Sequence, residues 1–497
     1  MKLAARTLLL ICVILAVSAP LFLNLGAQPL RVWDESRNAV NAQEMIKDGD
    51  FIVPHFRGKP EMWNTKPPLV IWCQVVSIKL FGMTEFAIRL PSAVAGLATC
   101  VLLFWFGRIY FNSEFTGTFS ALILVSTLGF VSYHVTRTGD LDAFLTLFTS
   151  ASLLCFYLYT ETKNKKYLQW FFTSAALAVL SKSIVVFLFI PGVILYLLFT
   201  KKIKITLQNK ELYRQSYLFI APVLGYYLLR EYYNPGYLSA VYKNEIAGRY
   251  FESIENHSES FWFYFDNILS ERYSYWIFPA LAALILGIFA SEQRLKKINF
   301  YIFGCVLTFL LILSTAKSKI AWYDAPIYPL LAIGIAVQIN AIIEMITNRF
   351  NLRKYIKYMY KVSLVIALIG VPYVTVFKNV SRVEELEHEK DFYAIEYFLR
   401  DNETKVSELK APHVVYDGYD VQVEFYVNRY QMNGMNIELV PSQNVQVGDE
   451  IIVCQAEVLD QLKDQFHIEI RNKRPYITIG LVKGLKLTKH KKRPTKL

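Results

Sequence analysis

The chain has 497 residues, of which 54% are hydrophobic, 15% aromatic and only 19% charged. That charge is too sparse to cover a water-soluble protein of this length, so the composition excludes an ordinary soluble domain and indicates a membrane protein. The formal net charge of +12 is partly a signal of membrane topology and does not require a nucleic-acid partner.

Long apolar runs recur along the first three quarters of the chain. Each is close to the ~20 residues that cross a hydrocarbon core of ~30 Å. The runs lie at 8–26, 90–111, 117–134, 141–160, 167–181, 184–200, 216–233, 273–291, 299–315, 324–345 and 361–378. Because several runs are short, we expect about 11 to 13 transmembrane helices. An apolar stretch at 67–82, interrupted by Gln74 and Lys79, is better interpreted as a helix at the membrane surface.

Two features of the chain could suggest a different kind of protein: the N-terminus could suggest a secreted protein, and the cysteines could suggest a disulfide-bonded or metal-binding one. Lys2 and Arg6 before the first apolar run resemble a signal peptide, but a multi-span chain more often keeps this segment as its first helix. The six cysteines show no paired spacing, so they indicate neither a disulfide framework nor a metal knuckle.

Basic residues in the short loops assign the two sides of the membrane, because Lys and Arg concentrate on the cytoplasmic side. With a cytoplasmic N-terminus, alternation places all the short basic loops inside. These are 163–166, 201–214, 294–297 and 349–357, with three, five, three and four basic residues. The external connections are then 27–89, 135–140, 182–183, 234–272 and 316–323, followed by residues 379–497.

A second domain follows the last span. From about Asn379 onwards, short apolar stretches alternate with polar residues, as in a soluble α/β domain. We therefore divide the chain into a transmembrane domain, 1–378, and a soluble extracytoplasmic domain, 379–497. The predicted elements are a helix at 382–400 and strands at 413–416, 423–427, 451–454 and 476–482. Ten basic residues and no acidic one lie between Arg471 and Lys496, which indicates either a solvated tail or contact with anionic lipids.

Charged residues follow directly after the first span. The sequence Arg31-Val32-Trp33-Asp34-Glu35-Ser36-Arg37 places two carboxylates and two guanidinium groups at the membrane surface. Charge at this depth is costly unless it is paired, so the segment is a candidate functional site. The structural alternative is that Asp34 caps a helix through Asn38 and Met45, while Arg37 forms a surface ion pair.

The same long external loop continues through His55 to Lys66-Pro67-Pro68. A residue before proline is held in an extended conformation, so Lys66 could be presented to a phosphate at the bilayer surface. A Lys-Pro-Pro sequence is also common in ordinary turns.

The other external loops also carry acids, bases and cations. They contribute Arg137, Asp140, Asp142, Glu245, Arg249, His257, Lys317, Lys319 and Tyr323. This recurrence on one face is what a site for an anionic, lipid-embedded substrate requires. A lone histidine such as His257 is more often a plain surface residue.

Several of these segments, taken in order, resemble the protein mannosyltransferase and aminoarabinose transferase family. The resemblance covers residues 1–345 and includes Trp33-Asp34-Glu35-Ser36-Arg37, Lys66-Pro67-Pro68-Leu69, Arg89-Leu90-Pro91-Ser92, Arg137-Thr138-Gly139-Asp140-Leu141-Asp142 and Leu180-Ser181-Lys182. Members of this family have the GT-C fold and transfer sugars from polyprenyl-phosphate donors. The C-terminal domain is similar to the family only in position and size.

The resemblance implies a role for each matched residue. Asp34 matches the catalytic carboxylate and Asp142 a second acidic position of the site. Lys66 and Arg37 match residues that hold the lipid phosphate, and His257 matches a metal-associated histidine of the aminoarabinose branch. That branch has Glu before Lys-Pro where this chain has Thr65, so a metal ligand is missing or replaced; no cofactor is certain, and a divalent metal at His257 stays open.

The residues and the resemblance together predict a membrane glycosyltransferase of the bacterial inner membrane. We expect Asp34 and Asp142 to be catalytic. The expected substrate-binding residues are Glu35, Arg37, His55, Lys66, Arg137, Arg249, His257, Lys317, Lys319 and Tyr323. The partners would be a polyprenyl-phosphate sugar and an acceptor in lipid A, another glycan or a protein, with inversion at the anomeric carbon.

Two other classes are open. A transporter or flippase also has many spans, but it would place ionisable residues near the bilayer midplane and often contains repeats. Here most charges lie at span ends on one side, and no internal repeat is detectable. A membrane-anchored assembly protein would leave the Asp34 and Lys66 loops without a purpose.

Overall fold

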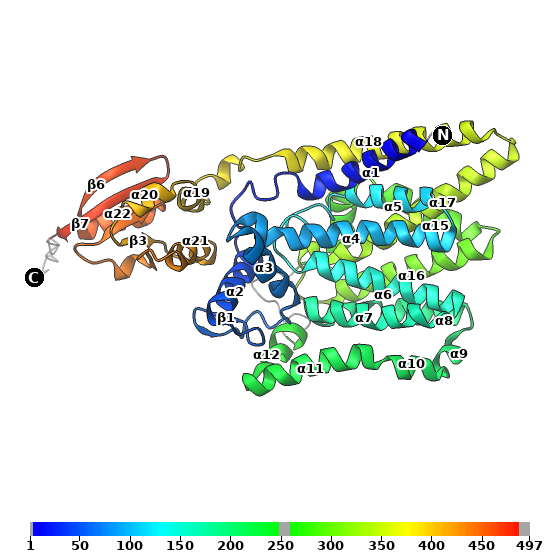
Figure 1. Cartoon of the computed structure of the whole chain (residues 1–497), viewed down its shortest axis with the longest axis horizontal. Helices are drawn as coiled ribbons and strands as arrows, with labels where there is room; N and C mark the ends of the chain where they lie inside the picture. The colour runs from blue at the N-terminus through cyan, green and yellow to red at the C-terminus, as the bar shows by residue number, and fades with distance from the viewer. Residues whose placement is uncertain (1–2, 248–258, 487–497) are drawn as a thin grey trace, which may run out of the picture. The chain divides into compact units, whose positions relative to one another are not determined.

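The computed structural model describes residues 3–247 and 259–486, which form two compact units (Figure 1). The first unit consists of Met1–Leu25 and Glu44–Arg382, and the second of Gly26–Gln43 and Val383–Leu497. The chain therefore enters the second unit twice, once after the first helix and once after the last long helix. Helix α2 (Asp34–Asp48) contributes its N-terminal part to the second unit and its C-terminal part to the first.

The first unit is a bundle of helices. Its longer members are α1 (Leu3–Phe22), α4 (Glu85–Phe111), α5 (Glu114–Val125), α6 (Asp142–Thr162), α7 (Lys165–Lys182), α8 (Ile190–Phe199), α11 (Tyr217–Tyr233), α15 (Ile277–Phe289), α16 (Gln293–Thr315), α17 (Tyr328–Arg349) and α18 (Lys354–Ser381). Helices α4, α6, α7 and α16 run in nearly parallel or antiparallel directions (Figure 1).

Short elements connect these helices. They are β1 (His55–Phe56), β2 (Lys59–Pro60), α3 (Leu69–Phe81), the 3-10 helices η1 (Ser183–Phe189) and η5 (Ala321–Ile327), α9 (Ile203–Leu207), α10 (Lys210–Gln215), α12 (Tyr237–Val241), α14 (Phe263–Asn267) and the π-helical turns η2 (Tyr242–Ala247) and η4 (Ile268–Arg272). A helix is therefore present where 67–82 predicted one.

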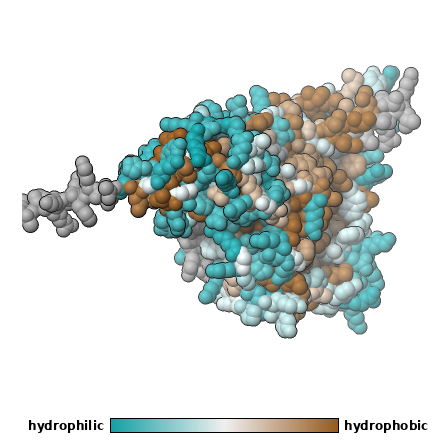
Figure 2. All heavy atoms as spheres, turned by 60° about the vertical axis from the view of Figure 1, so that its left-hand side comes forward, coloured by the Kyte–Doolittle hydropathy of each residue, from teal (hydrophilic) through white to brown (hydrophobic). Residues whose placement is uncertain are grey.

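Within the described residues, six helical segments are long and apolar enough to cross a membrane. A seventh is formed if Phe263–Arg272 and Ile277–Phe289, which meet at a bend of 114°, count as one broken span. Three shorter apolar helices are also present: Ile11–Phe22, Leu69–Phe81 and Glu114–Val125. Many large apolar side chains of the bundle are exposed, and hydrophobic residues gather over it in Figure 2. A polytopic membrane protein is thus confirmed, while the number of 11 to 13 spans stays a prediction.

One of the six segments, Lys165–Phe199, is a helical hairpin. Its middle residue Lys182 contacts Asp142 at the start of α6. Tyr196, near the end of the segment, instead contacts Glu161 at the other end of α6. The chain must therefore turn back between these residues, and Ser183, with φ of 58°, lies at the turn. Each half of the segment runs the length of α6, as the predicted external connection at 182–183 requires.

Glycines allow two pairs of helices to approach closely. A Cβ atom on Gly117 of α5 would lie 2.5 Å from the carbonyl oxygen of Phe104 in α4. On Gly192 of α8, a Cβ atom would lie 2.5 Å from the Cα of Cys305 in α16. Small residues at such contacts are typical of helix packing in membranes, where close backbone contact replaces the hydrophobic driving force.

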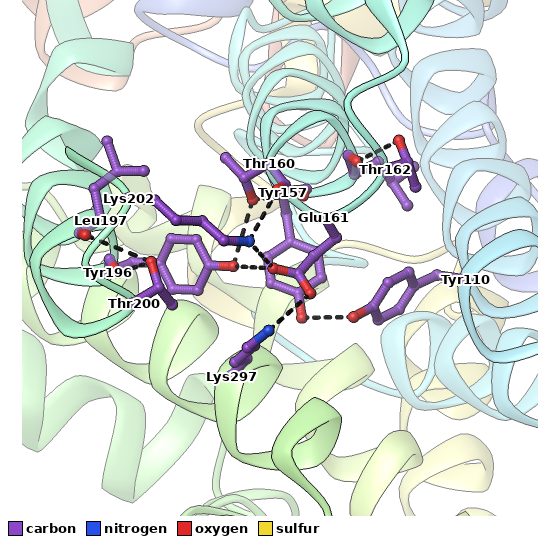
Figure 3. Close-up of polar contacts among 11 residues, drawn as sticks. Tyr110, Tyr157, Thr160, Glu161, Thr162, Tyr196, Leu197, Thr200, Lys202 and Lys297 are labelled. Atoms are coloured by element: carbon purple, nitrogen blue, oxygen red, sulfur yellow. Dashed lines mark hydrogen bonds and ion pairs between the residues drawn. The ribbon is translucent and has the colours of Figure 1, made fainter. Parts of the chain in front are cut away.

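The end of the bundle opposite the Asp142–Lys182 contact contains the basic loops. Glu161 accepts hydrogen bonds there from Lys202 at 2.5 Å, Lys297 at 3.3 Å and Tyr196 at 2.9 Å (Figure 3). These residues come from three separate predicted cytoplasmic segments or their adjoining spans. Their convergence on one carboxylate is what a single cytoplasmic face predicts.

The second unit has a five-stranded mixed sheet in the order β4-β3-β5-β7-β6. Its strands are β3 (Pro412–Val415), β4 (Glu438–Val440), β5 (Glu450–Val453), β6 (Phe466–Arg474) and β7 (Ile477–Leu485). Strand β3 pairs in parallel with β4 and β5, whereas β7 is antiparallel to β5 and β6. The helical elements are η6 (Glu387–Glu389), α19 (Ala394–Asp401), α20 (Glu403–Ser407), α21 (Val421–Met432), η7 (Ser442–Asn444) and α22 (Ala456–Gln465). A soluble-type α/β domain is confirmed.

Two local predictions in this unit need correction. Residues 423–427 lie in α21 rather than in a strand. Because α21 is buried on most of its surface, its apolar residues need not follow a helical stripe, and their alternation imitated a strand. The predicted helix at 382–400 is present only as η6 and α19.

Segment Gly26–Gln43 is tied to the C-terminal residues by polar contacts. Arg31 pairs with Glu385 at 2.9 Å, and its guanidinium carbon lies 4.6 Å from the ring centre of Tyr393. The backbone amide of Leu30 donates to the hydroxyl of Tyr426 at 3.1 Å. Since these groups are buried, the contacts fix the start of α2 on the sheet-containing unit.

Candidate functional site

A cavity of about 320 Å³ lies within the first unit. Its walls are mainly apolar side chains from η1 and the end of α16, including Leu188 and Ile312. Polar groups also line it, and they come from five parts of the chain: Lys66, Asp142, Lys182, Glu245, Ser318 and Tyr323. A cavity with cations among apolar walls suits an anionic group attached to a hydrocarbon chain.

The charges in this cavity are paired. Lys182 Nζ lies 2.6 Å from the Asp142 carboxylate, and Lys66 Nζ lies 3.3 Å from Glu245. All four side chains are at most one-tenth exposed. The Lys182 ammonium also lies 4.4 Å from the ring centre of Tyr323. Burying these ions would be costly without such partners, so the pairs make the cavity stable without a ligand.

Local structure positions each of these side chains. Lys66 precedes Pro67-Pro68 and the first residue of α3, which keeps it out of a helix. The hydroxyl of Tyr237 donates to the Thr65 carbonyl at 2.7 Å, and the Thr65 hydroxyl donates to Glu245 at 3.3 Å. Asp142 begins α6, where the helix dipole favours a carboxylate.

The predicted acidic segment lies at the start of α2, in the second unit. Asp34 is the first residue of the helix and is exposed. Glu35 is fully buried, and its carboxylate accepts a hydrogen bond from the Arg31 amide at 2.7 Å. Burial raises the pKa of Tyr419 to about 12, and the nearby Asp34 charge also raises it, whereas the Arg37 charge lowers it. Asp34 and Arg37 therefore lie near the same tyrosine.

Two of the predicted substrate-binding cations, Arg137 and Lys319, donate hydrogen bonds to backbone carbonyls, and their role toward a substrate stays a prediction. Arg137 donates to Leu21 at 2.8 Å and to Leu23 at 2.6 Å, at the C-terminal end of α1. Lys319 donates to Ala316 at 2.7 Å and to Glu259 at 2.9 Å. These contacts cap helix ends and loops, which is a structural use of the charge.

The remaining predicted residues fall outside the cavity lining or outside the described residues. His55 lies in the β1–β2 hairpin, and Lys317 is exposed. Arg249 and His257 lie outside the residues that the structure describes. Across residues 3–247 and 259–486, no three His, Cys, Asp or Glu side chains are grouped so that they could hold a metal ion.

Lys182 and Glu245 were not among the residues predicted to form the site. Lys182 ends the Leu180-Ser181-Lys182 motif of the resemblance and Glu245 is one of the external-loop charges, so both had a signal, but neither was assigned a role. A feature without a sequence signal is His134, whose ring stacks on Trp322 at 3.7 Å and whose Nδ1 lies 3.3 Å from Asp140.

Comparisons with known proteins show which families the sequence is similar to. The model of the dolichyl-phosphate-mannose-protein mannosyltransferase family matches residues 65–227, which include Lys66, Asp142 and Lys182. An uncharacterized protein of Aquifex aeolicus is 30% identical over 325 residues, covering 64% of this chain and 62% of that protein. An undecaprenyl phosphate-alpha-4-amino-4-deoxy-L-arabinose arabinosyl transferase of Aeromonas salmonicida is 29% identical over 322 residues, covering 63% and 57%. The aligned region therefore spans about three-fifths of these relatives' length.

Solved structures show the fold. ArnT from Cupriavidus metallidurans, solved with undecaprenyl phosphate, has a TM-score of 0.70 and 15% identity, covering 97% of this chain and 98% of that one. The oligosaccharyltransferase AglB from Archaeoglobus fulgidus, solved with an inhibitory peptide and a dolichol-phosphate, has a TM-score of 0.53 and 10% identity, covering 88% and 65%. The protein is thus a multi-pass bacterial inner-membrane protein of the GT-C fold. Within that class, the chain is similar to the mannosyltransferases over residues 65–227 and to the aminoarabinose transferases over about 320 residues.

Proposed function

We propose that the protein is an inverting membrane glycosyltransferase that uses a polyprenyl-phosphate-linked sugar as donor. The observation that carries this proposal is the cavity of the first unit, which combines two lysines with apolar walls. An isoprenoid chain would contact the apolar walls, and the phosphate would contact Lys66 and Lys182. The aminoarabinose relatives are named for undecaprenyl phosphate, and ArnT was solved with that lipid bound, which supports the same donor class.

The proposed reaction needs a base, an electrophilic carbon and a stabilised leaving group. The acceptor oxygen attacks the anomeric carbon and forms the new glycosidic bond, while the bond from that carbon to the phosphate oxygen breaks. The leaving lipid phosphate keeps the electron pair, and Lys66 and Lys182 offset its charge. Asp34 accepts the proton of the acceptor hydroxyl, as its match to the family's catalytic carboxylate implies. Attack opposite the leaving group inverts the anomeric centre.

We further propose that the reaction takes place on the extracytoplasmic face and that the second unit lies on that side. The support is the distribution of basic residues, because loops rich in Lys and Arg converge at the other end of the bundle around Glu161. The acceptor would then be lipid A, another glycan or a protein. Labelling of single cysteines placed at Lys243 or at Lys296 in intact cells would test this assignment.

The base assignment is tested by transfer assays with the purified chain in lipid nanodiscs. Labelled undecaprenyl-phosphate sugars would be presented, and label would be measured in lipid, glycan and protein fractions. Asp34→Asn should abolish transfer, whereas Asp48→Asn, an exposed residue at the other end of the same helix, should not. Full transfer by Asp34→Asn would refute the assignment of the base. No transfer from any donor, together with substrate-dependent lipid movement in liposomes, would instead favour a transporter.

The phosphate-binding role of the cavity needs a separate measurement. Undecaprenyl phosphate binding should weaken about tenfold or more in Lys66→Met, since one charge-assisted contact is lost. Lys243→Met, an exposed lysine two residues from Glu245, is the matched control. Because removing Lys182 leaves Asp142 buried without its partner, the double variant Asp142→Asn with Lys182→Met separates binding from folding. Equal binding by all variants would contradict the phosphate site.

A further inference from the structure

The second unit contains its own cavity, of about 820 Å³. Segment Gly26–Gln43, the residues before α19, the ends of β3 and β5, helix α22 and the β6–β7 turn all contribute to its lining. It is more than twice the volume of the cavity in the first unit and contains many polar side chains. The proposed donor site uses none of its lining residues.

Exposed aromatic rings are concentrated in this cavity. In the described part of the second unit, the exposed aromatic side chains are Trp33 at 53%, Phe392 at 41% and Tyr476 at 53%, and all three line it. A fourth lining ring, Tyr419, packs against Trp33 with ring centres 4.3 Å apart. Large rings left in water within one hollow indicate a binding surface rather than core packing.

Two of these rings are held on strained backbone. Trp33 has φ of 74° and Tyr476 has φ of 66°, a region that non-glycine residues rarely occupy. The carbonyl of Trp33 accepts hydrogen bonds from the Arg37 amide at 3.0 Å, the Ser36 hydroxyl at 3.0 Å and the Tyr419 hydroxyl at 3.3 Å. Strain that is fixed by several contacts is typical of ligand sites, where it positions a side chain before the ligand arrives.

Charged groups of both signs surround the rings. Asp391, Asp460, Lys463, Lys473 and Arg474 all line the cavity. Carboxylates accept hydrogen bonds from hydroxyl groups, and lysine and arginine donate to ring or hydroxyl oxygens. Apolar residues such as Leu459 and Ile477 also line the cavity, but a wholly apolar occupant would take these charged groups out of water without replacing its hydrogen bonds.

We propose that this cavity binds a saccharide. The flat C–H face of a pyranose ring packs on an aromatic ring, while its hydroxyl groups need donors and acceptors around the edge, and the cavity offers both. Trp33 immediately precedes Asp34, and the Tyr419 hydroxyl donates a hydrogen bond to the Trp33 carbonyl at 3.3 Å. The bound saccharide is therefore the acceptor glycan of the transfer reaction, a role that rests on the proposed function.

Binding is tested with the full chain in nanodiscs by saturation-transfer NMR and by titration. The probes are soluble oligosaccharides: chitobiose, maltotetraose and a phosphorylated glucosamine disaccharide. At least one should bind, and Tyr476→Ala should weaken it about tenfold, as expected for the loss of one aromatic contact. Val447→Ala removes an exposed apolar group of the same unit outside the cavity and should leave binding unchanged. No binding of any probe, or equal binding by Tyr476→Ala, would overturn the proposal.

Transfer kinetics separate this proposal from the proposed function. With saturating donor, Tyr476→Ala should raise the KM for the acceptor about tenfold with little change in kcat, whereas Asp34→Asn should lose kcat and still bind the saccharide. Ring-dependent binding without any transfer would retain the site and refute its role as the acceptor site of a transferase. Transfer with an unchanged acceptor KM in Tyr476→Ala would retain the function and refute the site.

Discussion

Glu396 gives the second unit a stability that depends strongly on pH. Its side chain lies in α19, is fully buried and is close to Tyr416 and Cys454, which line the proposed saccharide cavity. Burial raises the pKa of Glu396 from 4.5 to about 8, because the charged carboxylate loses its hydration. The acid is therefore protonated in the folded protein at neutral pH.

Because the pKa is raised in the folded state, the second unit loses stability as pH rises. An unfolded glutamate ionises near pH 4.5, so the neutral, buried acid contributes its full stability below that value and loses it as pH rises through about 8. At ~1.4 kcal/mol per pKa unit, ionisation would cost the folded unit roughly 5 kcal/mol by pH 9. Rotation of Arg31 towards the new charge would recover part of this, since it already interacts favourably with Glu396.

Glu396→Gln tests this reasoning, because glutamine has the shape of the protonated acid and does not ionise. Hydrogen exchange of β3 and β5 in the full chain, measured at matched pH, reports the opening of the second unit. The variant should be protected at least about 100-fold better than wild type at pH 9 and equally well at pH 5. A difference of the same size at both pH values would show that packing, rather than ionisation, is responsible.

Three further substitutions test the packing of the first unit, each by thermal unfolding of the detergent-solubilised chain. Arg137→Met should lower the free energy of unfolding by about 1–3 kcal/mol, because carbonyls at the end of α1 lose their donors. Loss of sugar transfer without loss of stability would indicate a substrate-binding role instead. Gly117→Ala should destabilise by about 1–3 kcal/mol because its Cβ would meet the Phe104 carbonyl, and Gly225→Ala, with open space around it, is the control. Glu161→Gln should lower the free energy of unfolding by roughly 1–2 kcal/mol, a value reduced because the pairs are partly exposed to solvent. An unchanged midpoint of thermal unfolding would show that the two lysine pairs contribute nothing to stability.

The sequence predicts the helices better than it predicts their partners. Apolar runs follow from the thickness of the hydrocarbon core, and basic loops follow from the preference of Lys and Arg for the cytoplasmic side. Each segment meets these requirements alone. Thus the turn at Ser183 and the basic cluster around Glu161 lie where topology predicts them. By contrast, residues 421–432 are buried on most sides, which is a property of the tertiary fold. The sequence alone therefore favoured a strand where the structure has helix α21.

For the candidate site, too, the sequence predicts individual residues better than the contacts between them. Lys66, Asp142 and Tyr323 were predicted because each lies in or beside a recognisable external motif, and the cavity contains all three. Lys182 and Glu245 complete the cavity, but neither the motif that ends at Lys182 nor the loop around Glu245 indicated which residues they would contact. The attachment of Gly26–Gln43 to the C-terminal unit depends on contacts such as Arg31 with Glu385, 354 residues apart, for which one sequence contains no local signal.

The geometry of the two ion pairs indicates that the two lysines are held by their carboxylates with different strength. Charge-assisted N–H···O contacts are usually about 2.7–2.9 Å long. Lys182 lies within hydrogen-bonding distance of both Asp142 oxygens, at 2.6 Å, whereas Lys66 is 3.3 Å from Glu245 and 3.4 Å from the Asn64 amide oxygen. Lys66 therefore loses less when it turns to an incoming phosphate, whereas Lys182 would contact the phosphate without leaving Asp142, which it keeps oriented. We accordingly expect the donor phosphate to displace Glu245 from Lys66, which releases a carboxylate beside the sugar, where its hydroxyl groups need acceptors.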